Sequence, residues 1–279
     1  MKDFVERFGQ WAVVTGASSG IGEAFARQLA ETGMNLVLVA RREDRLKKLA
    51  DDLQGAHSVN VRVVSADLSH HDFMPPIEQA TADLQVGLLV NNAGIATTGK
   101  FLDNDLAEEL ALLHVNNRAT LILAHHFGQP MRHRRRGGMI FLSSTVAFAG
   151  GPGWSNYAAS KAYDLVLAEG LAKELHRDGI SVLALCPGPT RTDLWPQGAK
   201  LSSPMTPQAV VDVALRKLGR RTTVVAGWLN SIMAFATRLT PRSWNAAIFG
   251  WAVGGMLKGV DTAGRAQKEH PNAAASNTG

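Results

Sequence analysis

The sequence predicts an α/β fold: one doubly wound sheet of seven parallel strands, with helices on both faces. Three observations support this prediction. Short apolar runs alternate with helix-length amphipathic stretches along the chain. The apolar runs are continuous, as is typical of strands buried on both faces. A glycine-rich turn also follows the first apolar run, where a doubly wound fold binds phosphate groups.

The first half of the predicted sheet has four strands and two helices. The strands are expected over Trp11 to Thr15, Asn35 to Ala40, Asn60 to Ser65 and Gly87 to Asn91. The helices are expected over Glu23 to Glu31 and Arg45 to Leu53. Gly33 suits the residue after the first helix, because glycine readily adopts the left-handed conformation found there.

The second half has three strands and three helices. The strands are expected over Gly138 to Ser143, Ile180 to Cys186 and Thr222 to Ala226. The helices are expected over Leu106 to His126, Asn156 to Asp178 and Gln208 to Leu218. Thr206 and Pro207 form an N-cap and first-turn pair that opens the last of these helices.

Length and composition favour one domain. The chain has 279 residues, and neither an internal repeat nor a Pro-, Gly- and Ser-rich linker precedes residue 260. We therefore expect a single domain over residues 1–262, which includes a C-terminal helical extension at about 228–262. The small and polar segment 263–279 is expected to be a disordered tail.

Charge and cysteine content restrict the class of protein. With 46% hydrophobic and 19% charged residues, wholesale disorder is excluded. The net charge of +5 does not predict a nucleic-acid partner. The single cysteine, Cys186, excludes an intramolecular disulfide and is expected to be a buried structural thiol. Because no apolar signal core opens the chain, we expect a cytoplasmic protein.

The turn from Thr15 to Gly22 reads Thr-Gly-Ala-Ser-Ser-Gly-Ile-Gly and suits a dinucleotide. Gly16 permits a tight turn, Gly20 lets the backbone approach a pyrophosphate, and Gly22 allows close helix packing. The following helix N-terminus presents N–H groups to an anion. The spacing is G-x-x-x-G-x-G, so a plain strand-to-helix turn remains an alternative on this motif alone.

Two arginines predict the cofactor. A fold of this type that selects NAD has an acidic residue after the second strand, about 20 residues beyond the glycines. Here Ala40 is followed by Arg41 and Arg42. Guanidinium groups suit a 2′-phosphate, and the Ser18 and Ser19 hydroxyls are further partners. We therefore predict NADP(H), the alternative being that these arginines only open a solvated helix.

Tyr157 and Lys161 are spaced for acid–base chemistry. Residues four apart share one face of a helix. An ammonium about 4.5 Å from a phenol, at an effective dielectric constant of about 20, would lower the phenol's pKa by up to about 2.7 units. This would bring a tyrosine into the working range of a catalyst. A Tyr-x-x-x-Lys motif without other motifs is more often a pair of side chains on the surface of a helix than a catalytic site.

With these motifs, the sequence resembles the short-chain dehydrogenase/reductase family over roughly residues 8 to 227. The glycine turn, the Asn91-Asn92-Ala93-Gly94 run, Ser144, the Tyr157/Lys161 pair and Pro187-Gly188 stand in the family's order. The resemblance implies that Tyr157 is the general acid or base and that Ser144 polarises the substrate oxygen. It implies that Lys161 lowers the tyrosine pKa and binds the nicotinamide ribose, and that Asn116 holds a proton-relaying water.

The resemblance also implies a Rossmann-like fold and a set of cofactor-binding residues. Asp67 and Leu68 would lie at the adenine, and Thr190 and Thr192 near the nicotinamide or phosphates. The full set is Gly16, Ser18, Ser19, Gly20, Ile21, Gly22, Arg41, Arg42, Asp67, Leu68, Asn92, Ala93, Gly94, Tyr157, Lys161, Pro187, Gly188, Thr190 and Thr192.

These observations predict an NADP(H)-dependent oxidoreductase that transfers a hydride between the nicotinamide and a carbonyl or alcohol, with a mild preference for hydrophobic substrates. A sugar-nucleotide epimerase or dehydratase is the first alternative, disfavoured by the glycine spacing and the lack of a large C-terminal substrate domain. A non-catalytic NADP-binding sensor is the second, disfavoured by the complete set of catalytic residues. The family resemblance also implies a homo-oligomer, a dimer or tetramer.

Other signals receive a structural interpretation. We interpret the basic run Arg132 to Arg136 as a solvated loop, and the histidines His125 and His126 as solvated side chains. No metal site is predicted. The segment Thr190 to Ser203, with Trp195, is expected to form a lid over the substrate. In the C-terminal extension, core packing or a subunit contact is favoured over contact with a membrane surface. Its tryptophans are Trp228, Trp244 and Trp251.

Overall fold

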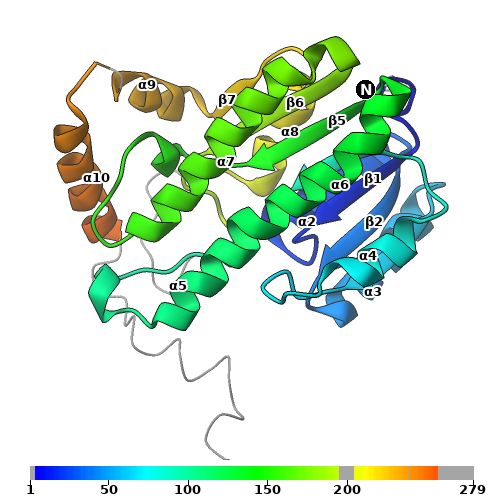
Figure 1. Ribbon diagram of the computed structural model, residues 1–279, viewed down its shortest axis with the longest axis horizontal. Coiled ribbons are helices and arrows are strands. Elements are labelled where there is room, and N and C mark those ends of the chain that lie inside the picture. Colours follow the sequence, from blue (N-terminus) through cyan, green and yellow to red (C-terminus); the bar gives the residue numbers. More distant parts are fainter. Residues whose placement is uncertain (1–3, 195–203, 238, 257–279) are drawn as a thin grey trace, which may run out of the picture.

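The computed structural model describes residues 4–194, 204–237 and 239–256 (Figure 1). Seven parallel strands form one sheet in the order β3-β2-β1-β4-β5-β6-β7. The prediction of a doubly wound, Rossmann-like sheet is confirmed. The strands are β1 (Trp11–Thr15), β2 (Asn35–Ala40), β3 (Val61–Ser65), β4 (Val86–Asn91), β5 (Gly137–Leu142), β6 (Ile180–Pro187) and β7 (Thr223–Ala226).

The strand order reverses between β1 and β4, and this reversal positions the site. After β3 the chain returns across β1 and continues outward in the other direction. The helices that follow β1 and β4 therefore leave opposite faces, and a crevice opens at the carboxyl ends of these strands. The glycine turn after β1 and the Asn92 segment after β4 meet there.

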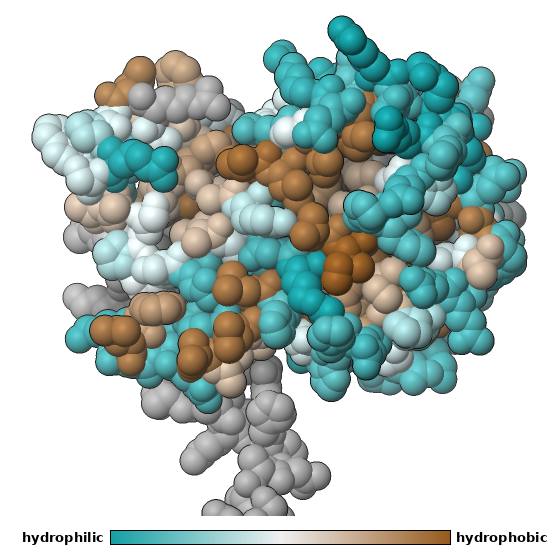
Figure 2. All heavy atoms as spheres, viewed as in Figure 1, coloured by the Kyte–Doolittle hydropathy of each residue, from teal (hydrophilic) through white to brown (hydrophobic). Residues whose placement is uncertain are grey.

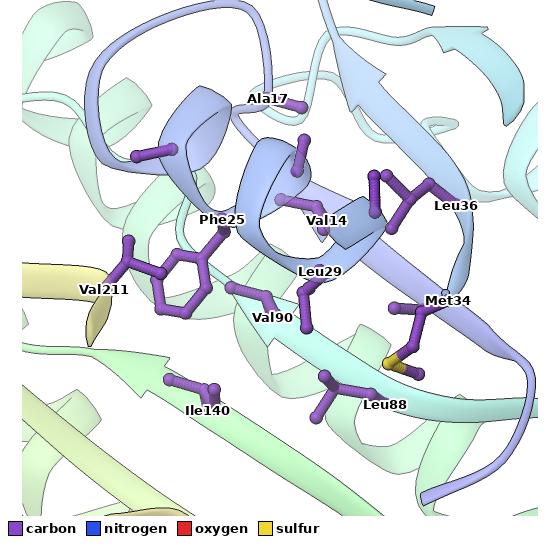
Figure 3. Close-up of a cluster of buried hydrophobic side chains, with 14 of the residues drawn as sticks. Val14, Ala17, Phe25, Leu29, Met34, Leu36, Leu88, Val90, Ile140 and Val211 are labelled. Carbon is purple, nitrogen blue, oxygen red and sulfur yellow. The ribbon is translucent and has the colours of Figure 1, made fainter. Parts of the chain in front are cut away.

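Helices α2 (Gly20–Glu31), α3 (Glu43–Ala56) and α8 (Pro207–Lys217) cover one face of the sheet. Phe25, Leu46 and Val211 from these helices are buried against the strands. The close-up around α2 shows Phe25 and Val211 among these side chains (Figure 3). The short helix α1 (Phe4–Phe8) adds two phenylalanines to the same core. Burial of this apolar surface holds the helix after the glycine turn in place.

Helices α4 (Met74–Thr81), α6 (Ala119–Arg134) and α7 (Ser155–Glu174) cover the other face (Figure 1). Ile77, Phe127 and Leu165 pack there against the strands. Helices α1 and α4 were not expected. The first turn of α4 contains two prolines, which is compatible with a helix because N–H groups there have no partner within the helix.

The helix expected over Leu106 to His126 differs in two ways. It is α5 (Leu106–Leu113) and α6, joined through a π turn, η2 (His114–Arg118). It also continues to Arg134, so the prediction of a loop at Arg132 to Arg136 is wrong for the first three of these residues. The helix ends at Arg135, whose φ of 50° is left-handed.

A C-terminal helical extension follows β7, as expected. It consists of α9 (Trp228–Ala236) and α10 (Arg242–Met256). Among the described residues, none of the helices combines the length and the apolar character that a bilayer-spanning helix needs. Trp195, the side chain of Trp251 and segment 263–279 lie outside the description.

Candidate active site

The glycine turn has a backbone that only glycine adopts without strain. Gly16 and Gly20 have φ values of 65° and 59°. A Cβ atom on Gly16 would lie 2.9 Å from the Cα of Ala93, and one on Gly22 would lie 2.2 Å from the carbonyl oxygen of Gly16. Helix α2 begins at Gly20, so its free N–H groups border this turn. These features fit a dinucleotide pyrophosphate.

Thr15 joins the glycine turn to the segment that follows β4. Its hydroxyl oxygen accepts hydrogen bonds from the backbone N–H groups of Asn92 and Ala93, each at 3.0 Å, and donates to the carbonyl of Val90. The Asn92 side chain donates back to the Thr15 carbonyl at 2.8 Å. The glycine turn and the segment after β4 are thus fixed to one another.

Arg42 lies beside the glycine turn as the sequence predicts. Its guanidinium donates to the Ser18 hydroxyl at 3.0 Å and to the Ser19 hydroxyl at 2.8 Å. The carboxylate of Asp193, which the sequence analysis did not include, lies 3.7 Å from Arg42 and 3.3 Å from Arg45. Two guanidinium groups and two hydroxyls at this place suit a phosphate monoester.

Arg41 and Asp67 lie close to one another at the ends of β2 and β3. Arg41 Nη1 is 4.0 Å from Asp67 Oδ2. Partial burial alone would raise the pKa of Asp67, but hydrogen bonds from Ser69 and the charges of Arg41 and His70 bring it below its usual value. The neighbouring Leu68 is buried. Asp67 is therefore an anion fixed at the edge of the crevice.

Asn116 lies in the π turn η2 and is fully buried. Its amide donates to the Ile95 carbonyl and to the Ser160 hydroxyl, both at 3.0 Å, and its oxygen accepts from the Ile95 N–H at 2.9 Å. A π turn adds one residue to the helix, and such turns are frequent at functional sites. Here the turn presents two successive amides, Asn116 and Asn117, to α7.

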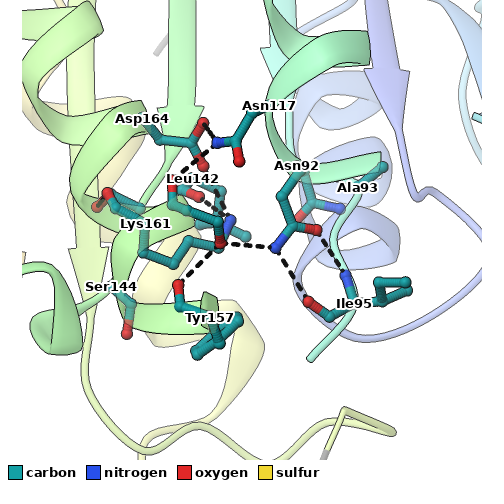
Figure 4. Close-up of polar contacts among 12 residues, drawn as sticks. Asn92, Ala93, Ile95, Asn117, Leu142, Ser144, Tyr157, Lys161 and Asp164 are labelled. Atoms are coloured by element: carbon teal, nitrogen blue, oxygen red, sulfur yellow. Dashed lines mark hydrogen bonds and ion pairs between the residues drawn. The ribbon is translucent and has the colours of Figure 1, made fainter. Parts of the chain in front are cut away.

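Ser144, Tyr157 and Lys161 gather at the carboxyl end of β5 (Figure 4). Ser144 caps the short helix η3 (Thr145–Phe148), and its hydroxyl lies beside the Tyr157 phenol. Ser143 points elsewhere, and its hydroxyl donates to the Lys161 carbonyl at 2.7 Å. A Cβ atom on Gly94 would lie 3.5 Å from Lys161 Nζ, so the segment after β4 borders this group.

Lys161 acts on the Tyr157 pKa in the expected direction, but the pKa as a whole lies above its usual value. Burial, the largest effect, raises the pKa of Tyr157. The Lys161 ammonium and the Ser144 hydroxyl oppose this rise, while the Asp164 carboxylate adds to it. The expected shift included the Lys161 ammonium only. It did not include the burial of the Tyr157 phenol or the Asp164 carboxylate, which lies one helical turn beyond Lys161.

Asp164 is a further polar residue that the sequence analysis missed, and Asn117, the sequence neighbour of Asn116, contacts it. Asp164 Oδ2 lies 3.0 Å from Lys161 Nζ, and Asn117 Nδ2 lies 3.4 Å from Asp164 Oδ1. The spacing of Lys161 and Asp164, three residues on one helix, was a signal that could have found the pair. The π turn brings the Asn117 amide, as well as that of Asn116, against α7.

At the expected nicotinamide end, the segment after β6 lies against both the glycine turn and α9. A Cβ atom on Gly20 would lie 3.0 Å from Cγ2 of Thr192, and one on Gly188 would lie 2.5 Å from the Asn230 amide. The Thr190 hydroxyl donates to the Gly188 carbonyl at 3.0 Å. Helix α9 therefore begins directly beside the site, a contact that the sequence analysis did not include.

Apolar side chains surround Tyr157. The ring of Trp154 packs edge-on against the Tyr157 ring, with centroids 5.3 Å apart. Leu112, Val146 and Ala158 complete this buried cluster. Partly buried neighbours are Ile95, Ala96, Leu194 and Phe249. A phenol in such surroundings suits a substrate with an apolar body.

Comparison with known proteins assigns the family. A family model described as short chain dehydrogenase matches residues 10–200. The chain belongs to the short-chain dehydrogenase family. The expected resemblance is thereby confirmed, and the family is one of oxidoreductases that use NAD(P).

Similar proteins include hydroxysteroid dehydrogenases. A 7beta-hydroxysteroid dehydrogenase from Mediterraneibacter gnavus is 33% identical over 81% of this chain and 89% of its own length. A solved structure of a 7beta-hydroxysteroid dehydrogenase has a TM-score of 0.83 and 28% identity, covering 88% of this chain and 98% of that chain. A Sphingobium yanoikuyae short-chain dehydrogenase in complex with NADPH has a TM-score of 0.74 and 32% identity, covering 91% and 97%.

Proposed function

We propose that this chain is an NADP(H)-dependent oxidoreductase of the carbonyl reductase or alcohol dehydrogenase type. The observation that carries the proposal is the meeting of Ser144, Tyr157 and Lys161 beside Gly94, at the end of the crevice that the glycine turn opens. When bound, the nicotinamide supplies or accepts the hydride at the carbonyl carbon. The side chains of this site supply the proton and the orientation.

Each catalytic side chain has a distinct task in this proposal. Tyr157 donates its phenolic proton to the substrate oxygen during reduction and takes it back during oxidation. Ser144 donates a hydrogen bond to the same oxygen and stabilises the charge that develops there. The Lys161 ammonium stabilises the phenolate left behind and binds the nicotinamide ribose, and Asn116 holds the water that returns a proton.

The preference for NADP(H) rests on Arg42 and its two hydroxyl partners. A 2′-phosphate would accept charge-assisted hydrogen bonds from Arg42, Ser18 and Ser19, with Arg41 alongside. The relative solved with NADPH supports this choice. The remaining residues of the expected cofactor set are proposed to contact the adenine, the pyrophosphate and the nicotinamide.

A hydrophobic ketone or secondary alcohol is the proposed substrate class. The apolar cluster around Tyr157 supports it, as do relatives that are named for hydroxysteroids. Reaction rates would be followed by the loss of NADPH absorbance with a panel of ketones that includes 7-oxo steroids. NADH would be run in parallel, and we expect NADPH to be the better cofactor.

Tyr157→Phe is the decisive variant, and Tyr163→Phe is its matched control on the same helix, with an exposed side chain. The first should lose turnover but bind NADPH normally, while the second should keep both. Retention of most of the kcat in Tyr157→Phe would refute the mechanism. Tight NADPH binding without turnover on any substrate of the panel would favour the sensor alternative.

The proposal includes a homo-oligomer in the cytoplasm. Exposed apolar side chains lie along α5, α6 and α7, the face toward the viewer in Figure 2. They are Leu106, Leu110, Leu113, Leu121 and Val166. A second copy would remove this apolar surface from water. A buried free thiol, Cys186, suits a reducing compartment.

A further inference from the structure

A buried ion pair adjoins the Tyr157 phenol. Lys161 Nζ and Asp164 Oδ2 are 3.0 Å apart on α7, and their side chains are 5% and 4% exposed. A carboxylate with so little access to water must be stabilised by its partners. The catalytic roles proposed above do not involve Asp164, so its burial at this place requires a separate explanation.

Two elements hold the Asp164 carboxylate. Lys161 contributes its ammonium from the preceding helical turn and also donates to the Leu142 carbonyl at 2.7 Å. Asn117, from the π turn η2, donates to Asp164 Oδ1 at 3.4 Å and to the Ser160 carbonyl at 2.9 Å. Asp164 therefore has partners both on its own helix and on the element packed against it.

The charges around this pair come from few groups. On α7 the titratable neighbours are Tyr157, Tyr163 and Lys161, and β6 contributes the Cys186 thiol, which Glu169 of α7 also faces. The π turn contributes neutral amides, because its Arg118 donates instead to the carbonyls of His70 and His71. Among these described neighbours, Lys161 is the cation closest to the phenol, and Asp164 neutralises it.

We propose that Asp164 is a positioning residue that holds the Lys161 ammonium in a buried pair without net charge, and thereby keeps the Tyr157 phenol protonated and ready to donate. An unpaired ammonium would favour the phenolate. The paired ammonium stabilises the phenolate less strongly, so the phenol stays a proton donor at neutral pH. The consequence for catalysis rests on the proposed function: at neutral pH the phenol is in the protonated form that donates to the substrate oxygen.

The chain offers a direct spectroscopic test because it has two tyrosines, Tyr157 and Tyr163. In a Tyr163→Phe background, phenolate absorbance during an alkaline titration reports Tyr157 alone. The signal needs neither cofactor nor substrate. A Tyr157→Phe/Tyr163→Phe protein provides the blank, and far-ultraviolet circular dichroism at each pH verifies that the protein is folded.

Adding Asp164→Asn to this background should lower the Tyr157 titration midpoint by about one pH unit or more, a tenfold rise in the acid dissociation constant. Asp212→Asn is the matched control, because Asp212 pairs with Arg216 one turn away on α8 but is 48% exposed. The control should leave the midpoint unchanged. Asp164→Glu keeps the carboxylate and should return the midpoint to that of the parent.

Asp164→Ser removes the same charge and leaves room for water beside the ammonium, so it replaces the asparagine variant if that protein does not fold. An unchanged midpoint in a folded charge-removing variant overturns the proposal. A shifted midpoint in a protein that turns over no ketone supports the proposal for Asp164 and refutes the proposed function. If the Asp164→Asn protein is active, the pH at which its rate of alcohol oxidation begins to rise should fall by the same amount as the Tyr157 titration midpoint.

Discussion

The guanidinium of Arg42 donates to the hydroxyl of Ser19 at 2.8 Å, across 23 residues of sequence. The contact joins the end of β2 to the glycine turn after β1. The Asp193 carboxylate lies 3.7 Å from the same guanidinium. The Asp193 carboxylate is the anion beside Arg42 in this structure, so a phosphate at this place would have to displace it.

Arg42→Ala should weaken NADPH binding about tenfold, because a charge-assisted hydrogen bond contributes about 1.5 kcal/mol or more. NADH binding should change little, since it lacks the 2′-phosphate. Calorimetric titration measures both affinities. Arg27→Ala, which removes an arginine from the outer side of α2, is the control. An equal loss for NADH would show that Arg42 shapes the turn without reading the phosphate.

Two helical glycines should respond in opposite directions to the same substitution. Gly22→Ala places a Cβ atom 2.2 Å from the Gly16 carbonyl oxygen, so we expect a loss of about 2–3 kcal/mol in the free energy of unfolding. Gly170→Ala on α7 meets no atom within 4 Å and should add about 0.5–1 kcal/mol. Urea denaturation measures both. Equal effects would contradict the close helix–turn contact.

Thr15→Val should disconnect the glycine turn from the segment after β4. The substitution leaves the buried N–H of Asn92 and the partly buried N–H of Ala93 without their acceptor. We expect the free energy of unfolding to fall by about 2–4 kcal/mol. Thr15→Ser keeps the oxygen and should lose about 1 kcal/mol or less. Denaturant titration of the three proteins decides, and similar losses in both variants would contradict a special role for the Thr15 hydroxyl oxygen as the acceptor of these N–H groups.

Val166→Glu should convert the proposed oligomer to a smaller species. Val166 is 66% exposed on α7, within the apolar face described above. A carboxylate there would lose its hydration in a subunit contact. Light scattering after size exclusion gives the mass. Ile232→Glu on α9, at 56% exposure, tests the other apolar surface. A reduced mass in the α9 variant alone would move the contact to the C-terminal extension.

Cys186 should be unreactive in the folded protein. Burial raises the pKa of its thiol to about 12, so at about pH 8 almost none is thiolate. Iodoacetamide should modify it only after denaturation. Because the unfolded thiol ionises near pH 9 and the folded one near pH 12, stability should fall as the pH rises through this window. Cys186→Ala should show a smaller fall, and rapid native labelling would contradict the burial.

The sheet was predictable because its strands are buried on both faces. A short, continuous apolar run such as Leu36 to Val39 is typical of a buried strand. The bounds of β1 and β2 are those that the sequence predicts. The five-residue helix α1 and the proline-opened α4 gave weaker signals. Their formation depends on packing of Phe8 and Ile77 into cores built by distant segments.

The candidate site was predictable in its residues and less so in its electrostatics. Spacing on one helix predicted that Tyr157 and Lys161 share a face. It could not give the degree of burial, which reverses the expected direction of the Tyr157 pKa shift. The π turn at Asn116 is stabilised by Ile95 and Ser160, which are distant in sequence. Local propensity contains no information about such partners.

The reversal of strand order between β1 and β4 has a consequence for biosynthesis. The glycine turn can meet its partner segment only after β4 and the residues that follow it, with Asn92 and Gly94, have been synthesised. The helix that carries Tyr157 is translated some sixty residues later. A nascent chain thus contains both sides of the crevice before it contains β5 or the helix with Tyr157.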